Sequence, residues 1–474
     1  MVIIREASIK EKETLLNEQE DHFLDFKSKD IAPNKLQESF VAFANSDGGD
    51  LYVGIEDDKY EGERIRGFEK VEEANAIIEV LLEQTEPAVE NVDIEFIKFI
   101  NLGLVLHISI PKSPKVHFTA QKKCFIRVNA NKREIKGERV LALGYAKGTY
   151  QYEKQLVKHA NVKDIIESEY LIDYMQRIET DLPPEKFLQK QRLIEKDEDK
   201  FYPNVGGVLL FDEEPQATLD TRCAIKIYRL RTTGEEYNRR FLSGEPVTIV
   251  GNLENMINKS LEQIDLMLRD TLYSIDGSFY KSKYPTIAIK EVLVNAIIHR
   301  DYSLSDDIHI IIYDNRIEIK SPGRLPGYIT VDNIYDERYS RNPNIVRLLH
   351  KLPNPPNHDI GEGLNTVKNE LHQVGLIEPE IKETDNAVVV IIHHTKIATV
   401  EQIIRDLFRE DRNRSITNKL VREKSGEMNI NIVKKSLQKL RKMGYIKIKD
   451  KKVSLFKYEY VIDEKGVQEW IDEK

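Results

Sequence analysis

The stretch EVLVNAIIHRDY, residues 291–302, places a carboxylate and an amide one helical turn apart inside an otherwise apolar segment. Its apolar residues recur with the helical period, which predicts a helix with a core-facing stripe. Glu291 and Asn295 would project from one face, and burying such a pair costs free energy unless it meets a partner. A nucleotide with an oxygen-ligated Mg²⁺ would be such a partner, with Asn295 bound to the metal and Glu291 orienting or deprotonating water. The alternative is an ordinary amphipathic helix with both residues at its solvated edge.

Three loop segments follow this helix. The strand-like residues 316–320 lead into SPGRLP at 321–326, SRNP at 340–343 precedes a predicted helix, and DIGEGL at 359–364 opens another. Glycine loops at strand ends, and glycines directly before helices, expose backbone N–H groups that can hold phosphate. Taken singly, each segment is more often a plain turn.

Taken in this order, the pattern ExxxN, SPGxLP, SRNP and GEGL resembles the ATP-binding domain shared by gyrase, histidine kinases, mismatch-repair ATPases and heat-shock chaperones, in its shorter divergent branch. The resemblance covers about residues 200–395. It implies a Bergerat-type α/β sandwich that holds ATP between a sheet and helices. It also implies that Asn295 binds Mg²⁺ and that Glu291 is the general base.

The glycine boxes of that family would correspond to Gly323, Gly361 and Gly363. Ser321 stands where the family has an Asp that reads adenine, and Leu325 stands where the box has its second glycine. Because a serine hydrogen-bonds adenine more weakly than a carboxylate does, this departure predicts reduced base selectivity and nucleotide binding without rapid hydrolysis.

A second polar group lies near the N-terminus, in EDHFLDFK at 20–27. In an extended segment Asp25 and Lys27 share a face, next to the acid Glu20. Asp57 follows the strand predicted after the glycine turn at 48–49. Three carboxylates that converge on a sheet edge could hold Mg²⁺ or Mn²⁺ for phosphodiester hydrolysis, with Lys27 stabilising the charge on the phosphorane. The alternative is a solvated charged face.

The longer string, acid-x4-acid-Phe-Lys followed by FANSDGG at 43–49 and LYVGIED at 51–57, resembles the Schlafen-type AlbA_2 domain, a nucleic-acid-binding domain. The match covers about residues 12–135, and FIRV at 125–128 resembles the later aromatic-x-Arg strand, which implies that Arg127 contacts nucleic acid. Some members are nucleases through three acids that would map to Glu20, Asp25 and Asp57. The second position usually carries Glu, and the shorter Asp25 retracts the carboxylate by about one C–C bond.

The C-terminal part differs in charge from the rest. Residues 396–474 hold 20 Lys and Arg against 13 Asp and Glu, a net charge of +7, so the remainder carries −16 of the total of −9. Such an asymmetry points to a separate basic module.

The order of elements in this part is that of a winged helix. Helices are predicted at 400–408, 416–423 and 431–443, and strands at 445–448 and 453–460. The third helix is the candidate recognition helix, and its cations suit phosphate contacts on a duplex. These cations are Lys434, Lys435, Lys439 and Lys442. The alternative is a winged helix used for dimerisation.

The length of 474 residues predicts about three domains, which we place at 1–150, 151–395 and 396–474 in an α+β multidomain chain. The apolar run GGVLLF at 206–211 is predicted to be a strand. No apolar run approaches the roughly 20 residues that cross a bilayer, and the charged N-terminus predicts a cytoplasmic protein. Two distant cysteines, Cys124 and Cys223, argue against disulfides and zinc.

The first functional reading is a nucleotide-controlled, metal-dependent nuclease that acts on RNA or DNA in defence or stress response, with ATP as a conformational ligand. A second reading is an ATP-sensing transcription regulator without nuclease activity. A third is a scaffold with a vestigial ATP site. The resemblance also implies a homo-oligomer, because Bergerat-type domains often work as dimers.

Overall fold

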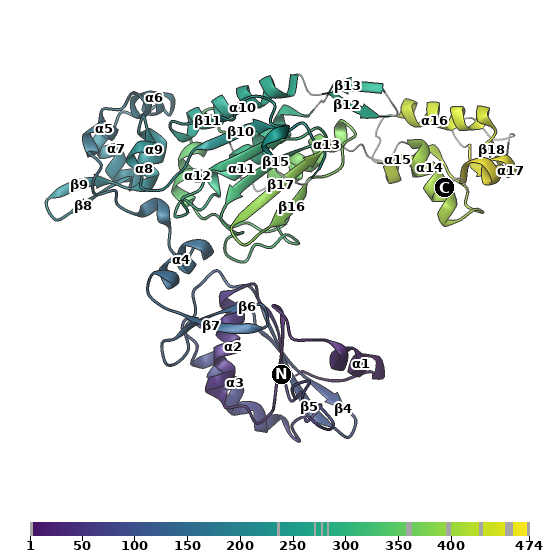
Figure 1. Ribbon diagram of the computed structural model, residues 1–474, viewed down its shortest axis with the longest axis horizontal. Helices are drawn as coiled ribbons and strands as arrows, with labels where there is room; N and C mark the ends of the chain where they lie inside the picture. The colour runs from purple at the N-terminus through teal and green to yellow at the C-terminus, as the bar shows by residue number, and fades with distance from the viewer. Residues whose placement is uncertain are drawn as a thin grey trace.

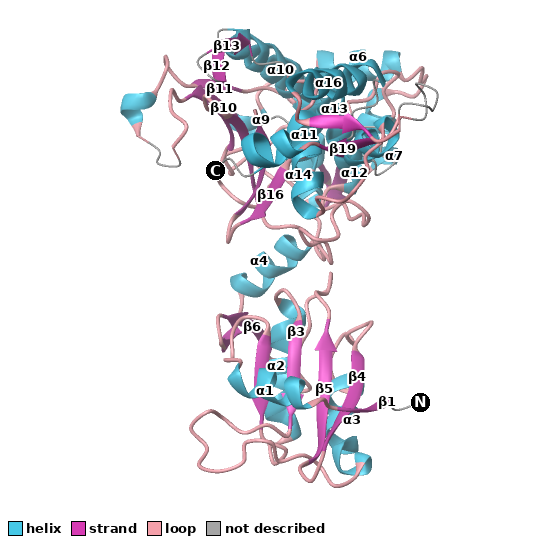
Figure 2. Ribbon diagram, turned by 90° about the vertical axis from the view of Figure 1, so that its right-hand side faces the viewer, coloured by secondary structure: helices cyan, strands magenta, loops and turns pink. Residues whose placement is uncertain are grey.

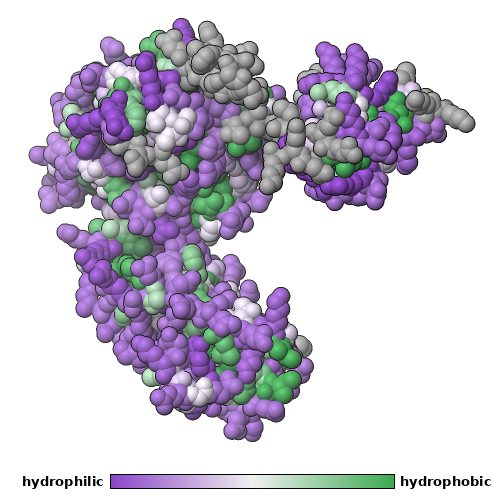
Figure 3. Space-filling view, turned by 45° about the vertical axis from the view of Figure 1, so that its right-hand side comes forward, coloured by the Kyte–Doolittle hydropathy of each residue, from purple (hydrophilic) through white to green (hydrophobic). Residues whose placement is uncertain are grey.

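The computed structural model describes residues 3–234, 238–269, 272–275, 278–281, 284–356, 363–394, 400–425, 430–450 and 458–471. Within them the chain is a mixed α+β protein with several sheets. An N-terminal unit lies below a larger central unit, and a C-terminal unit projects from the end of the central unit opposite to α5, α6 and α7 (Figure 1). Hydrophilic side chains cover most of the face in Figure 3, as the charged fraction of 32% predicts.

The N-terminal unit is built on a five-stranded sheet in the order β1-β4-β5-β3-β2. Helices α2 (Pro33–Asn45) and α3 (Asn75–Glu83) cover one face, and α1 (Ile9–Asn17) packs on part of the other (Figure 2). The strands are β1 (Ile3–Glu6), β2 (Leu24–Lys27), β3 (Gly49–Val53), β4 (Asp93–Phe99) and β5 (Gly103–Ile110). A hairpin of β6 (Cys124–Val128) and β7 (Asn131–Ile135) packs against α2.

The glycine turn between α2 and β3 is a point of close backbone approach. Gly48 has φ +80°, and a Cβ there would lie 2.5 Å from the carbonyl oxygen of Ile110. A Cβ at Gly49 would lie 2.5 Å from the carbonyl oxygen of Phe23. Only glycine lets β2 and β5 approach the turn this closely, so the SDGG segment fixes how β3 enters the sheet.

A helical segment connects the N-terminal and central units. It contains α4 (Glu138–Lys147), a 3-10 turn at Tyr152–Lys154, α5 (Val162–Ile166), α6 (Glu169–Arg177), α7 (Pro184–Gln191), the antiparallel hairpin β8 (Ile194–Asp197) and β9 (Lys200–Pro203), α8 (Val205–Phe211) and α9 (Pro215–Thr218). The strand predicted at 206–211 is wrong, because these residues form the buried helix α8. Asn204 caps it by accepting a hydrogen bond from the Gly207 N–H at 2.9 Å.

The central unit is a six-stranded sheet in the order β11-β10-β14-β15-β17-β16. Its strands are β10 (Ile225–Arg229), β11 (Val247–Ile249), β14 (Ile308–Ile312), β15 (Arg316–Pro322), β16 (Glu380–Glu383) and β17 (Ala387–His393). Strands β10 and β14 run parallel and the other neighbours antiparallel. The helices that share its hydrophobic core are α10 (Leu253–Arg269), α11 (Thr286–Ile298), α12 (Pro343–His350) and α13 (Gly363–Gln373). A small hairpin joins β12 (Leu272–Ile275) to β13 (Ser278–Lys281).

The C-terminal unit contains α14 (Val400–Glu410), α15 (Asn418–Ser425), α16 (Ile430–Met443) and the antiparallel pair β18 (Ile446–Ile448) and β19 (Tyr460–Ile462), followed by short helical turns at Glu464–Gly466 and Val467–Ile471. The three predicted helices are confirmed within a few residues. Of the second predicted strand, at 453–460, residues 453–457 lie outside the described part of the chain, and β19 begins at Tyr460 in the part that follows. Within the described ranges, no helix is both long and apolar enough to cross a membrane.

Candidate functional site

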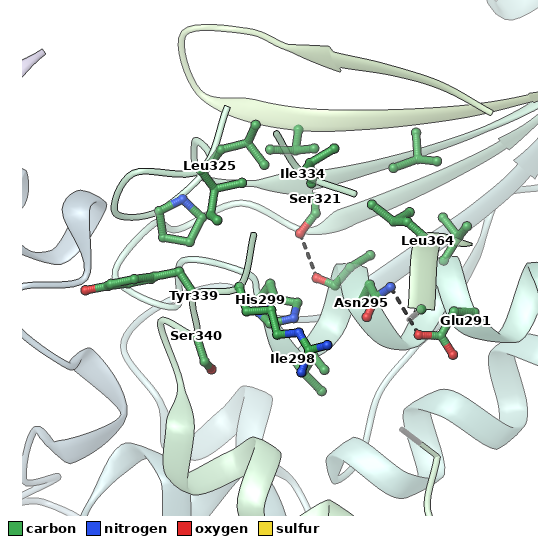
Figure 4. Close-up of a pocket in the computed structure, with 18 of the residues that line it drawn as sticks. Glu291, Asn295, Ile298, His299, Ser321, Leu325, Ile334, Tyr339, Ser340 and Leu364 are labelled. Carbon is green, nitrogen blue, oxygen red and sulfur yellow. Dashed lines mark hydrogen bonds between the residues drawn. The ribbon is translucent and has the colours of Figure 1, made fainter. Parts of the chain in front are cut away.

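A cavity of about 570 Å³ lies in the central unit between α11, β15, the loop that follows β15 and the first residues of α13 (Figure 4). Ligand pockets commonly have this size. The residues predicted to bind nucleotide converge on it even though they come from separate segments. Those that line it are Glu291, Asn295, Ser321, Gly323 and Gly363. Gly361 lies outside the described residues.

The polar pair of α11 faces the N-terminus of α13. Asn295 Nδ2 donates a hydrogen bond to Glu291 Oε1 at 3.3 Å. A Cβ at Gly363 would collide with Glu291 Oε1 and would lie 3.2 Å from Asn295 Nδ2. Glycine at this position therefore lets α13 begin against the polar pair, so that backbone N–H groups and two side-chain oxygens share one end of the cavity.

Ser321 lies on the sheet side of the cavity. Its hydroxyl donates a hydrogen bond to the carbonyl oxygen of Ala296 in α11 at 2.7 Å (Figure 4). Since the proton is committed to that bond, the hydroxyl oxygen can only accept from a ligand. The apolar side chains of Leu325, Val388 and Val390 line the same region. An apolar wall with one acceptor suits a flat ring that carries an amino group.

His299 adds an uncharged polar ring to the wall. Burial, followed by the nearby Arg341 charge, lowers the pKa of His299 to about 4. Its Nδ1 is buried and has no hydrogen-bond partner among the described residues. At neutral pH this ring is therefore neutral and retains capacity for a hydrogen bond.

Two residues of the SRNP segment, Arg341 and Asn342, support the wall of the cavity through hydrogen bonds to the backbone. Arg341 is 1% exposed and donates to the carbonyl oxygens of Arg324 at 2.6 Å and Ala146 at 2.9 Å. Asn342 donates to the carbonyl oxygens of Ile298 and Arg300, both at 2.9 Å, at the end of α11. Through these bonds to backbone carbonyl groups, both side chains position the wall of the cavity.

The N-terminal acids form a compact charged cluster on β2. Lys27 Nζ lies 2.6 Å from Asp25 Oδ1 and 3.2 Å from Glu20 Oε1, which also accepts from the Phe26 N–H at 2.9 Å. Asp25 is 2% exposed, and Arg127 lies 3.3 Å from its other oxygen. Burial and then the neighbouring Asp25 raise the pKa of Glu20. The predicted proximity of Glu20, Asp25 and Lys27 is confirmed.

The third acid of the prediction does not join this cluster. Asp57 is exposed beyond β3, and its Oδ1 accepts a hydrogen bond from the Lys59 N–H at 2.9 Å. The neighbouring Glu56 points inward instead and accepts from Ser28 Oγ at 2.9 Å. Nowhere in the described ranges are three or more His, Cys, Asp or Glu residues placed to hold a metal ion. As arranged, Glu20, Asp25 and Asp57 do not fit Mg²⁺ or Mn²⁺, because Lys27 and Arg127 already neutralise two of them.

Arg127 was predicted to contact nucleic acid, but its guanidinium is buried in this structure. It donates to the carbonyl oxygens of Asp21 at 2.7 Å and Leu24 at 2.8 Å, and it stacks on the ring of Phe43 at 4.4 Å. These contacts anchor β2 to α2. The lysines predicted on α16, by contrast, are exposed: Lys434, Lys435, Lys439 and Lys442.

The N-terminal unit holds one wall of the cavity in place. Asp47, in the glycine turn, receives two hydrogen bonds from Arg324, at 2.9 and 3.2 Å, and contacts His22 Nε2 at 2.7 Å. Lys112 donates to the carbonyl oxygens of Leu325 at 3.1 Å and Ile329 at 2.9 Å. Arg324, Leu325 and Ile329 all line the cavity. The sequence motifs contain Asp47 and Arg324, but no local pattern reveals a pair separated by 277 positions.

Comparisons with known proteins identify two domains in the chain. Residues 20–136 match the family model for "Schlafen, AlbA_2", and residues 305–392 match the one described as "Putative ATP-dependent DNA helicase recG C-terminal". The chain thus contains an AlbA_2 domain and an ATPase-type domain of the recG C-terminal kind, which together indicate a protein related to nucleic-acid binding and to ATP.

Among solved structures, the DIP2311 protein from Corynebacterium diphtheriae is similar at 17% identity over 96% of each chain, with a TM-score of 0.39. A comparison with curated proteins gives no match.

Proposed function

We propose that this chain binds ATP in the cavity beside α11 and that the bound nucleotide controls a nucleic-acid-acting N-terminal domain. The observation that carries the proposal is the shared wall: residues that line the cavity, Arg324, Leu325 and Ile329, are held by Asp47 and Lys112 of the AlbA_2 domain. A ligand that fits one position of this wall better than another shifts both domains together.

The cavity offers complementary ends for a nucleotide in a Bergerat-type arrangement. Ser321 accepts from the amino group of the base beside the apolar wall, while the first backbone N–H groups of α13 hold phosphate near Gly363. The side-chain oxygen of Asn295, whose amide donates to Glu291, would hold Mg²⁺, which usually takes one or two protein ligands in addition to phosphates. When bound, Mg²⁺ neutralises phosphate charge. Glu291 is the group that accepts a proton from water, and Ser321 in place of a carboxylate favours binding over rapid turnover.

The output proposed for the N-terminal domain is cleavage of RNA or DNA. Glu20 has a raised pKa, which suits a group that exchanges protons, and Lys27 supplies a positive charge beside it. Glu20 and Asp25 are paired with Lys27 and Arg127, so this proton exchange does not involve a metal at these acids.

The alternative is an ATP-sensing transcription regulator. The exposed lysines of α16 favour it, since three helices followed by a hairpin, with cations on the third helix, suit a winged helix on duplex DNA. Two copies of the chain would then place two such units on one operator.

Two measurements test the proposal on the full chain. Calorimetric titration should show ATP binding that weakens in Asn295→Ala and depends on Mg²⁺, whereas equal affinity with and without Mg²⁺ argues against a working site. Cleavage of labelled RNA and DNA should be lost in Glu20→Gln and kept in Glu61→Gln, an exposed acid of the same domain. Retained DNA binding without cleavage in every variant, wild type included, selects the regulator.

A further inference from the structure

A cluster of three cations, Lys190, Arg347 and Lys351, lies where α7 and α12 end. Arg347 NH1 and Lys351 Nζ both donate to the same oxygen, Gln191 Oε1, at 2.5 and 3.2 Å. Among the described residues, no Asp or Glu forms an ion pair with Lys190, Arg347 or Lys351. Burial, then Arg347 and then Lys190, lowers the pKa of Lys351, as expected when like charges gather.

Ordinary structural roles account for only part of this charge. Arg347 NH2 lies 3.4 Å from the carbonyl oxygen of Gln191, the last residue of α7, so it helps to cap that helix. The ends of two helices supply the equivalent of roughly half a negative charge each, which three full cations exceed. The acid Glu153 acts on Arg347 from a distance, but it is buried and accepts from the N–H groups of Asn344 and Ile345.

Lys190 of this cluster lies on a unit whose order of elements is similar to that at the C-terminus of the same chain. Helices α6 and α7 are followed by the hairpin β8–β9, just as α15 and α16 are followed by β18–β19. The exposed residues of α7 are polar, and Lys190 lies among them at the end of the helix. The tip of the hairpin, by contrast, carries Asp197, Glu198 and Asp199, so the favourable surface for a polyanion is the helix end and not the hairpin.

We propose that Lys190, Arg347 and Lys351 form a binding site for the phosphate backbone of a nucleic acid, separate from the nucleotide cavity, from the β2 acids and from α16. Guanidinium and ammonium donors that converge on one neutral oxygen are spaced to hold neighbouring phosphate oxygens. The inference rests on the nucleic-acid binding in the proposed function and adds a third surface to it. Because α12 belongs to the ATPase-type unit and α7 to the connecting helices, a bound strand would bridge them.

The test is the salt dependence of binding by the full chain to a labelled DNA duplex and to a single-stranded RNA of the same sequence. The variant is Lys190→Glu/Lys351→Glu, which keeps the capping Arg347. The matched control is Lys196→Glu/Lys200→Glu, which makes the same charge change on the hairpin of the same unit. The slope of log affinity against log salt should become shallower by about 0.9 per lost contact on the duplex, or about 0.7 on the single strand, only in the first variant.

Three results overturn the inference. If both variants match wild type in slope and affinity, the cluster takes no part, although nucleic-acid binding elsewhere stands. Tripolyphosphate, measured as a third ligand, distinguishes a site for small anions. If it binds to wild type but not to the first variant, while both nucleic acids bind to the variant as before, the site serves small anions. If wild type binds neither probe, the inference falls together with the nucleic-acid part of the proposed function.

Discussion

The ion pair between Asp47 and Arg324 joins the AlbA_2 domain to the wall of the cavity, so its removal should loosen that wall. Two charge-assisted hydrogen bonds, at 2.9 and 3.2 Å, connect the side chains. Hydrogen bonds to charged groups contribute roughly 1.5–3 kcal/mol each when well buried. Here Arg324 is 37% exposed and keeps Glu383 at 3.1 Å as a second partner, so solvent screening reduces the expected interaction to about 1–2 kcal/mol.

The assay is hydrogen exchange of the full chain, read on peptides from the loop at 323–340, in a double-mutant cycle of Asp47→Asn and Arg324→Gln. A loss of about 1–2 kcal/mol in local opening corresponds to exchange roughly 5–30 times faster. The amide of Gly327, which donates to the Lys147 carbonyl at 2.9 Å, should report this change. Peptides from α16 serve as the internal reference, and Asp58→Asn, an exposed acid of the same domain, is the matched control.

Strict additivity in this cycle would refute the reasoning, because residues that interact directly show coupling and independent ones do not. The pH dependence gives a second check. Burial raises the pKa of Asp47, but Arg324 and His22 outweigh it, and the pKa in the folded chain lies below the usual value. The contribution of Asp47 is therefore present above the unfolded pKa near 4 and is lost as the pH falls through the folded pKa.

Three further changes have defined outcomes. Replacing Asn204 with Ala removes the cap of the buried helix α8 and the hydrogen bond from Nδ2 to the Arg192 carbonyl oxygen at 2.7 Å, and should lower the free energy of unfolding by about 1–3 kcal/mol, measured by urea titration. Asn204→Ser, which keeps a neutral capping oxygen, should lose less. Gly363→Ala places a Cβ against Glu291 Oε1, and it should weaken ATP binding in calorimetric titration with little change in melting temperature. If the variant binds ATP with the affinity of the wild type, α13 does not begin at the ligand. His299 has a pKa of about 4 in the folded chain, so as the pH falls the unfolded state takes up the proton first, and the free energy of unfolding decreases between about pH 6.5 and 4. In His299→Gln this decrease should be smaller. An identical pH profile in the variant would contradict the lowered pKa of His299.

The sequence predicted the elements whose pattern is local. The helical periodicity of the C-terminal part predicted helices at 400–408, 416–423 and 431–443, and the structure has α14, α15 and α16 within a few residues of these bounds. The strand prediction at 206–211 is wrong because a short continuous apolar segment has no period that separates a strand from a buried helix. The cap from Asn204, two residues earlier, is the local signal that distinguishes them.

The site residues also divide into those that a local sequence motif predicts and those whose position depends on packing in three dimensions. Glu291, Asn295, Ser321, Gly323 and Gly363 could be predicted to share a cavity because each lies in a recognisable motif. The burial of Arg127 and the outward position of Asp57 could not be predicted from the sequence. Both depend on which residues lie next to each charge in the folded chain. Lys190, Arg347 and Lys351 belong to no motif, and only the packing of α7 beside α12 brings them together.

The contacts of Asp47 and Lys112 with the loop after β15 constrain how this chain can change over generations. An AlbA_2 domain exchanged by recombination for that of a relative would meet Arg324 and the carbonyl oxygens of Leu325 and Ile329 with whatever residues it carried at those two positions. If positions 47 and 112 carried other residues, the guanidinium of Arg324 would lose one of its carboxylate partners, and the carbonyl oxygens of Leu325 and Ile329 would lose the donor Lys112. The two domains should therefore be inherited as a pair, with Asp47, Lys112 and Arg324 changing together or not at all.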